Sequence, residues 1–360
     1  MFSRTLSAGV LTLAAAARLF AAEPVFPGKD WAVPPAGAEV IPPEKVDEAM
    51  AYLQTVVGKE GNSGTMIIQN GYVLWAGDNV DHKGAIWSCT KSFLSTCLGL
   101  LMDDGKCSPD DLASKYLPEL AADYPEVTLK QLATFTSGLR LERLSLDPGP
   151  PNYPPGAALN YSSESDLLAY ILTKIAGESL SDLFKRRIAD PIGMDPEGWE
   201  WKSVHERDGV KINGGAGYPD NGMHITARNL ARFGWLYAND GNWDGKQLIS
   251  QKYIREATVP LVPVDLPMHD PKAWYKPLLG TYGLNWWTNG IGVEGHRIWP
   301  SLPASTFAAQ GLKNNICIIV PEWKLVLVRT AQDEVINVGL FDGAFKIFKN
   351  ELNPPATAQK

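Results

Sequence analysis

The sequence predicts an α/β fold in which one antiparallel sheet is built from both ends of the chain, flanked by helices, around a large and mostly helical insertion. Two β-rich runs, residues 65–69 and 72–76, flank Asn70-Gly71, and Asn-Gly between such runs is typical of a tight hairpin. From Tyr282 onward the pattern returns to strands, whereas helical spacing dominates the residues between. Strands at both ends of a helical middle favour a single sheet interrupted by an insertion.

Local signals set the expected elements. Residues 43–57 carry an apolar stripe at helical spacing, and a last helix is expected over residues 333–352. The strands expected near the C-terminus are 282–287, 305–309, 315–320 and 324–330. We therefore assign residues 23–87 and 281–352 to the sheet region and residues 88–280 to the helical region. Together they are expected to form one domain over about residues 43–350.

Bulk composition limits the classes of function. Of the 360 residues, 45% are hydrophobic and 20% are charged, which is typical of a packed globular domain. The net charge of −7 and the lack of a basic patch in the sequence argue against nucleic acid as a partner. The five histidines are scattered without a zinc-binding spacing, and the four cysteines form no C-x-x-C pair. The sequence therefore predicts no metal site.

Residues 1–22 have the pattern of a secretory signal peptide. Arg4 supplies the positive start, residues 6–17 are apolar, and small residues near Ala21 and Ala22 offer a cleavage site. No other segment approaches the length of apolar sequence that spans a bilayer. We expect an exported protein, periplasmic or secreted, that keeps no membrane span after cleavage.

A short stretch, Ser88-Cys89-Thr90-Lys91, concentrates the candidate chemistry. It opens an apolar helix, and Ser88 is expected at the N-cap. Ser88 and Lys91 are three residues apart, so they share one helix face. Burial and the positive end of the helix dipole both disfavour the ammonium form of Lys91, and a neutral lysine can take the serine proton. The pair predicts a serine nucleophile activated without histidine; the alternative is a capped core helix with an incidental lysine.

Several further motifs follow this pair in order. They are Leu100-Leu101-Met102-Asp103-Asp104-Gly105, Thr136-Ser137-Gly138-Leu139, Asn160-Tyr161-Ser162-Ser163, Ile188-Ala189-Asp190-Pro191-Ile192-Gly193-Met194, Ala227-Arg228-Asn229-Leu230-Ala231-Arg232-Phe233-Gly234, Tyr282-Gly283-Leu284-Asn285-Trp286-Trp287 and Ala309-Gln310-Gly311-Leu312. Over roughly residues 43–350, this order resembles the serine β-lactamase-like superfamily. The similar branch holds class C β-lactamases, family VIII esterases and nylon-oligomer amidases.

The resemblance implies a β-lactamase/transpeptidase-like fold and a role for each matched residue. Ser88 would be the acylated nucleophile, Lys91 its base or proton relay, and Tyr161 a proton shuttle to the leaving group. Gly311, in the third motif on the strand lining the site, would let the substrate approach the backbone. The backbone N–H groups of Ser88 and Leu312 would hold the oxyanion. This chemistry requires no cofactor.

Two departures from the pattern bear on the substrate. The third motif begins with Ala309, where β-lactamases and penicillin-binding enzymes carry Lys or His, and the second motif ends in Ser163 rather than Asn. Both changes favour small uncharged esters or amides as substrates, with Lys313 a candidate replacement for the missing cation. The residues expected to shape the substrate pocket are Ser163, Ala309, Gln310, Gly311, Trp286, Trp287 and His296.

Two other functions stay open on the sequence. One is a β-lactamase or D-Ala-D-Ala carboxypeptidase that uses the same machinery on penicillin-like or peptidoglycan substrates. The other, from a different class, is a catalytically inactive binding protein on the same scaffold. An α/β-hydrolase is disfavoured because the sequence lacks the G-x-S-x-G elbow.

Overall fold

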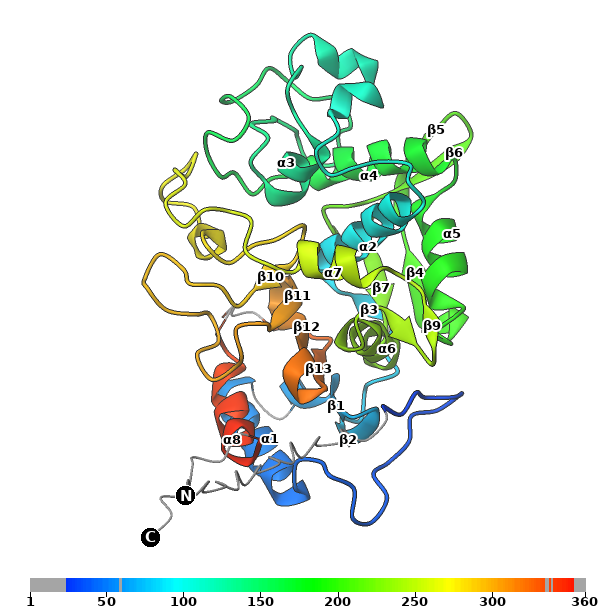
Figure 1. Cartoon of the computed structure of the whole chain (residues 1–360), viewed down its shortest axis with the longest axis vertical. Helices are drawn as coiled ribbons and strands as arrows, with labels where there is room; N and C mark the ends of the chain where they lie inside the picture. The colour runs from blue at the N-terminus through cyan, green and yellow to red at the C-terminus, as the bar shows by residue number, and fades with distance from the viewer. Residues whose placement is uncertain (1–23, 58–59, 334–336, 338, 353–360) are drawn as a thin grey trace, which may run out of the picture.

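A six-stranded antiparallel sheet forms the centre of the protein, in the strand order β10-β11-β12-β13-β1-β2 (Figure 1). The computed structural model describes residues 24–57, 60–333, 337 and 339–352, and the predicted signal peptide lies outside them. The strands come from both ends of the chain: β1 (Thr65–Gln69), β2 (Tyr72–Ala76), β10 (Trp287–Thr288), β11 (Phe307–Gly311), β12 (Asn315–Val320) and β13 (Leu325–Arg329). This arrangement confirms the predicted fold class.

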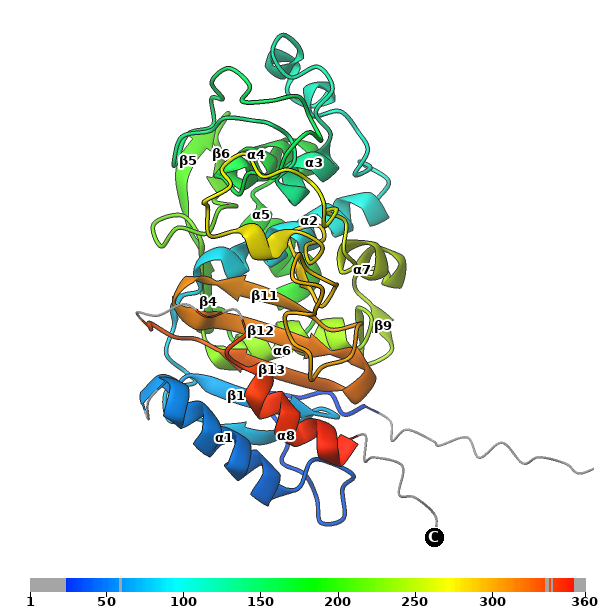
Figure 2. The same cartoon turned by 90° about the vertical axis from the view of Figure 1, so that its left-hand side faces the viewer.

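Helices cover both faces of the sheet. Helices α1 (Pro43–Val57) and α8 (Asp342–Leu352) lie side by side on one face, as Figure 2 shows. Helix α6 (Ala227–Ala238) packs against the other face, and α2 (Thr90–Asp103) reaches that face at β11. Because side chains alternate along a strand, Ile316 and Ile318 of β12 join the core under α1 and α8, whereas Cys317 and Ile319 join the core under α2 and α6. Strand β12 is therefore buried on both faces, which explains its unbroken apolar sequence.

The region between the two groups of strands lies mostly above the sheet in Figure 1 and is only partly helical. Its other helices are α3 (Leu129–Thr134), α4 (Glu164–Ala176), α5 (Leu180–Phe184), which runs into a π-helix (Lys185–Ala189), and α7 (Gln251–Ala257). Its strands are β3 (Gly84–Ala85), β4 (Trp199–Trp201), β5 (Ser203–Arg207), β6 (Val210–Asn213), β7 (Met223–Ile225), β8 (Asn242–Trp243) and β9 (Lys246–Gln247). These strands form three small sheets that the sequence pattern did not predict. Most of the strands have two to four residues, too few to show a clear alternation, and the five-residue β5 carries a single apolar residue, Val204.

The structure corrects four expected boundaries. The strand expected over residues 305–309 is β11, two residues later at Phe307–Gly311. Ser88 is not a helix N-cap: it lies in a 3₁₀ turn (Trp87–Cys89), and α2 begins after it with no side-chain capping bond. The strand expected over residues 282–287 shortens to β10, because Asn285 has a φ of 57° and interrupts extended backbone. The last helix begins at Asp342 rather than at Asp333, whose carboxylate instead pairs with buried Arg329.

Within the part of the chain that the structure describes, no helix is both long enough and apolar enough to span a bilayer.

Candidate active site

Ser88 occupies a strained turn at the start of α2. The residue before it, Trp87, has a φ of 51°, a left-handed conformation that is uncommon for a bulky side chain and is often found at functional sites. The turn is tied to β7 because the N–H of Ile86 donates to the Met223 carbonyl at 3.1 Å. Ser88 itself is half-buried. The hydrogen bond to β7 therefore anchors a turn in which Trp87, the residue before Ser88, adopts a conformation that local propensity alone would not select.

Lys91 lies in the first turn of α2 and is only 2% exposed. Its Nζ donates one hydrogen bond to Ser88 Oγ at 3.1 Å and another to the carbonyl of Ala216 at 2.5 Å. The same Nζ lies 4.8 Å from the ring centroid of Tyr161 and 6.0 Å from that of Phe135. The amine is thus enclosed by the serine hydroxyl, one backbone carbonyl and two aromatic faces, and it is placed to exchange a proton with Ser88.

Tyr161 lies at this site, with its ring toward the lysine. It precedes α4 and packs against Phe135 and the indole of Trp274, with ring centroids 4.3 and 5.1 Å away. Its hydroxyl makes no hydrogen bond to the residues that the structure describes, so the contact with Lys91 runs through the ring face. The structure brings Tyr161 and Lys91 together, and the role of the hydroxyl stays a prediction.

The third motif lies on β11, directly beside the turn Trp87–Cys89. Because this turn carries the candidate nucleophile Ser88, we call it the nucleophile turn. A Cβ added at Gly311 would overlap the Ile86 carbonyl oxygen and lie 3.0 Å from the backbone N of Ser88. Glycine is therefore needed here for the close approach of two backbones. Ala309 and Gln310 are buried in the same strand, and Leu312, the first residue after it, is 39% exposed.

Three residues expected in the pocket lie elsewhere. Trp286 is fully buried in the core beside Tyr237, with ring centroids 4.7 Å apart, and Trp287 is buried on β10 in the other core. His296 is exposed and pairs with Glu294 at 3.0 Å. The two tryptophans fill the core because they border the sheet, where apolar area is removed from water. Among the described residues, no hydrogen bond, ion pair or cation–π contact joins any of the three to Ser88 or Lys91.

Sequence reasoning missed the segment 214–218, which supplies a wall of the site. Ala216 offers the carbonyl that binds Lys91. Gly217 has a φ of 86°, and a Cβ there would overlap the Trp87 carbonyl. The hydroxyl of Tyr218 and the hydroxyl of Ser163 form a hydrogen bond of 3.0 Å. The cluster of glycines at 214, 215 and 217 was the available signal, since such residues mark close backbone approach.

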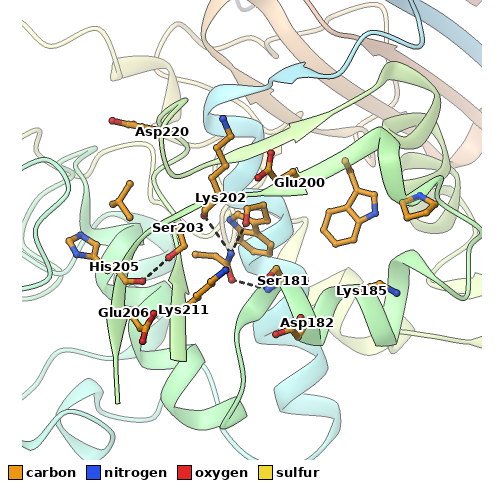
Figure 3. A pocket seen from close by; sticks show the side chains of 15 residues that line it. Ser181, Asp182, Lys185, Glu200, Lys202, Ser203, His205, Glu206, Lys211 and Asp220 are labelled. Carbon is orange, nitrogen blue, oxygen red and sulfur yellow. Dashed lines mark hydrogen bonds between the residues drawn. The ribbon is translucent and has the colours of Figure 1, made fainter. Parts of the chain in front are cut away.

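A pocket of about 700 Å³ lies over α5 and the strands β4, β5 and β6, apart from Ser88 and Lys91. Figure 3 shows that its side chains carry both signs of charge, including Lys202 and Glu200. Neither Ser88 nor Lys91 lines it. The pocket borders the segment that supplies Ala216 and is separate from the candidate active site.

The described residues offer neither a cluster of metal ligands nor a cysteine with a lowered thiol pKa. No group of three or more His, Cys, Asp or Glu side chains among them is placed to hold a metal ion. The cysteines Cys89, Cys97, Cys107 and Cys317 are free. Burial raises the pKa of the Cys89 thiol well above its usual range, although this residue adjoins Ser88. Ser88 rather than Cys89 is therefore the candidate nucleophile.

The antiparallel sheet, the Ser88–Lys91 hydrogen bond and the glycine strand beside it define a site of the serine-hydrolase type. The model of the Beta-lactamase family matches residues 65–347, and the chain belongs to this family. The protein is accordingly a hydrolase of that family.

Similar proteins agree with this assignment. The chain is 24% identical to the 6-aminohexanoate-dimer hydrolase of Paenarthrobacter ureafaciens, over 62% of this chain and 64% of that protein. The crystal structure of a family VIII carboxylesterase matches with a TM-score of 0.62 at 19% identity, covering 86% of this chain and 99% of that one. D-alanine carboxypeptidase AmpC from Burkholderia cenocepacia matches with a TM-score of 0.59 at 21% identity, over 85% and 97%. The family model confirms the expected superfamily, and the two solved structures agree with its fold.

Proposed function

We propose that this protein cleaves ester or amide bonds of small uncharged molecules through an acyl-enzyme on Ser88. The observation that carries the proposal is the 3.1 Å hydrogen bond from Lys91 Nζ to Ser88 Oγ, made by a lysine that is almost fully buried. A serine hydroxyl needs a neighbouring base to become an effective nucleophile, and this amine is the group in hydrogen-bond contact with it.

The reaction has two halves. Ser88 Oγ attacks the substrate carbonyl while its proton passes to Lys91 Nζ, and the N–H groups of Ser88 and Leu312 hold the resulting oxyanion. Each such donor contributes about 3 kcal/mol of transition-state stabilisation. The hydroxyl of Tyr161 gives its proton to the leaving group and regains one from Lys91 as the acyl-enzyme forms, so both side chains return to their starting state. Water then attacks the acyl-enzyme while Lys91 takes its proton, and that proton passes to Ser88 Oγ as the acid leaves.

The preference for uncharged substrates rests on the third motif. Ala309 is fully buried in β11 and offers no cation to a substrate carboxylate. One similar protein is named for the hydrolysis of an amide oligomer and another is a carboxylesterase, which supports both bond types. We also propose that the protein is exported, on the sequence pattern of residues 1–22.

A fluorophosphonate probe tests the nucleophile. We expect intact mass spectrometry to find a single adduct on the wild type and none on Ser88→Ala. A panel of p-nitrophenyl esters, amides and a fluorescent penicillin would then assign the bond type. Absence of an adduct on folded wild-type protein, together with no turnover of the panel, would refute the proposal and favour a binding role. Rapid labelling by the penicillin would favour the β-lactamase or carboxypeptidase alternative.

A further inference from the structure

A buried carboxylate with no part in the proposed chemistry lies behind Lys91. Asp166, near the start of α4, is 2% exposed. Its Oδ1 accepts hydrogen bonds from the backbone N–H groups of Gly215 at 2.8 Å and Ala216 at 2.9 Å, and from Asn221 Nδ2 at 3.5 Å. Its Oδ2 is buried and has no hydrogen-bond partner among the described residues. One oxygen of this side chain therefore accepts all three bonds, and the two shortest come from the segment 214–218 beside the active site.

The same segment holds the lysine from its other side. The carbonyl of Ala216 accepts the 2.5 Å hydrogen bond from Lys91 Nζ, and that Nζ also donates to Ser88 Oγ. A single residue, Ala216, thus links the carboxylate of Asp166 to the amine of Lys91. Lysine has a flexible four-carbon stem, so the position of its amine depends on the acceptors that fix it.

Two close backbone approaches restrict where this segment can lie. A Cβ at Gly215 would overlap the carbonyl of Ser165, which immediately precedes Asp166 on α4. A Cβ at Gly217 would overlap the carbonyl of Trp87 in the nucleophile turn. The segment therefore fits between α4 and the turn that carries Ser88, and Asp166 ties it to α4.

We propose that Asp166 is a positioning residue, which holds the backbone at 215–216 so that the Ala216 carbonyl keeps Lys91 Nζ at Ser88 Oγ. This inference rests on the proposed function. The side chain acts through the location of its Oδ1 acceptor, and its charge is secondary. A displacement of about 1 Å in a catalytic group can cost about 10²-fold in rate, so loss of this acceptor should slow the acylation of Ser88 while substrate binding changes little.

Three substitutions separate position from charge. Asp166→Asn keeps an oxygen acceptor in place without the charge, and the amide nitrogen replaces an Oδ2 that has no partner among the described residues. Asp166→Glu keeps the charge but moves the acceptor by one methylene, and Asp166→Ala removes both. The rate of fluorophosphonate labelling of Ser88 and the kcat and KM for an ester would be measured on each, with thermal unfolding as the check of folding.

We expect Asp166→Ala and Asp166→Glu to label about 100-fold more slowly, with KM changed by less than about threefold. Asp166→Asn should stay within about threefold of the wild type. Wild-type labelling in Asp166→Ala, or an active Glu variant beside an inactive Asn variant, would overturn the inference while leaving the proposed function standing. If Asp166→Ala does not fold, the Asn and Glu variants decide alone. Failure of the wild type itself to label would be a failure of the proposed function.

Discussion

Gly311→Ala tests whether the contact between β11 and the nucleophile turn creates the active geometry. The added Cβ would overlap the carbonyl oxygen of Ile86 and lie 3.0 Å from the backbone N of Ser88 and of Cys89. Three backbone atoms surround the new carbon, so no side-chain rotation can relieve the overlap. Strand β11 and the turn must move apart.

The size of the effect follows from that movement. Non-bonded carbon and oxygen atoms prefer a separation of about 3.5 Å, so the two backbones must separate by about 1 Å. A shift of that size at a reacting group costs about 10²-fold, equivalent to about 2.7 kcal/mol. The proposed oxyanion donors lie on the two backbones that separate, and loss of one such donor costs 10²–10³-fold by analogy with other enzymes. We therefore expect kcat to fall by at least about 100-fold.

The assay is ester hydrolysis together with the rate of fluorophosphonate labelling. Gly84→Ala is the matched control, because it is the same substitution in β3, just before the nucleophile turn, where the nearest atoms belong to His82 at 3.7 and 3.8 Å. We expect the control to label at the wild-type rate. A folded Gly311→Ala enzyme with kcat within about threefold of the wild type would refute the reasoning, because it would show that the close approach does not set the active geometry.

Three further predictions concern the buried residues Glu164 and Arg329 and the exposed Trp274. Burial raises the pKa of Glu164 well above its ordinary value, so the folded protein holds a proton that the unfolded chain releases, and the free energy of unfolding falls as pH rises. Measured by urea unfolding and compared with Glu164→Gln, the free energy of unfolding of the wild type should fall by up to about 1.4 kcal/mol per pH unit above about pH 5. Trp274 is 61% exposed and packs on Tyr161, so Trp274→Ala should raise KM about three- to tenfold for aromatic esters and leave acetyl esters unchanged. Arg329 is fully buried and pairs with Asp333 at 2.7 Å, so Arg329→Met should lower the free energy of unfolding by about 3–5 kcal/mol.

Each of these predictions has a control of the same chemistry. Glu142→Gln changes a side chain that is 83% exposed and should show no such pH trend; an equal trend in both variants would contradict the argument from Glu164. For Trp274→Ala, an equal change in KM for acetyl and aromatic esters would exclude a specific aromatic contact. Arg186→Met removes an exposed ion pair with Glu178 and should cost less than about 1 kcal/mol; a similar cost in both arginine variants would show that burial does not decide the effect.

Much of the fold was predictable because its signals are local. The hairpin of β1 and β2 follows from Asn70-Gly71 and the β-rich residues on either side. The bounds of β12 and α1 agree with the prediction because each combines a clear apolar pattern with a proline at one boundary. The spacing of Ser88 and Lys91 likewise indicated their hydrogen bond, since three residues bring two side chains to one side of a helical turn.

The sequence by itself thus determined the hairpin, the strands near the C-terminus, the order of the motifs and the spacing of the candidate pair Ser88 and Lys91. Only the tertiary structure decided what surrounds that pair. Ala216 is 125 residues from Lys91 in the chain, and Asp166 is 50 residues from Ala216. Trp286 is likewise buried in the core because Phe233 and Tyr237 of α6 pack against it. Contacts at such separations depend on how helices and strands pack, and the local pattern along the chain does not specify which distant residues then meet.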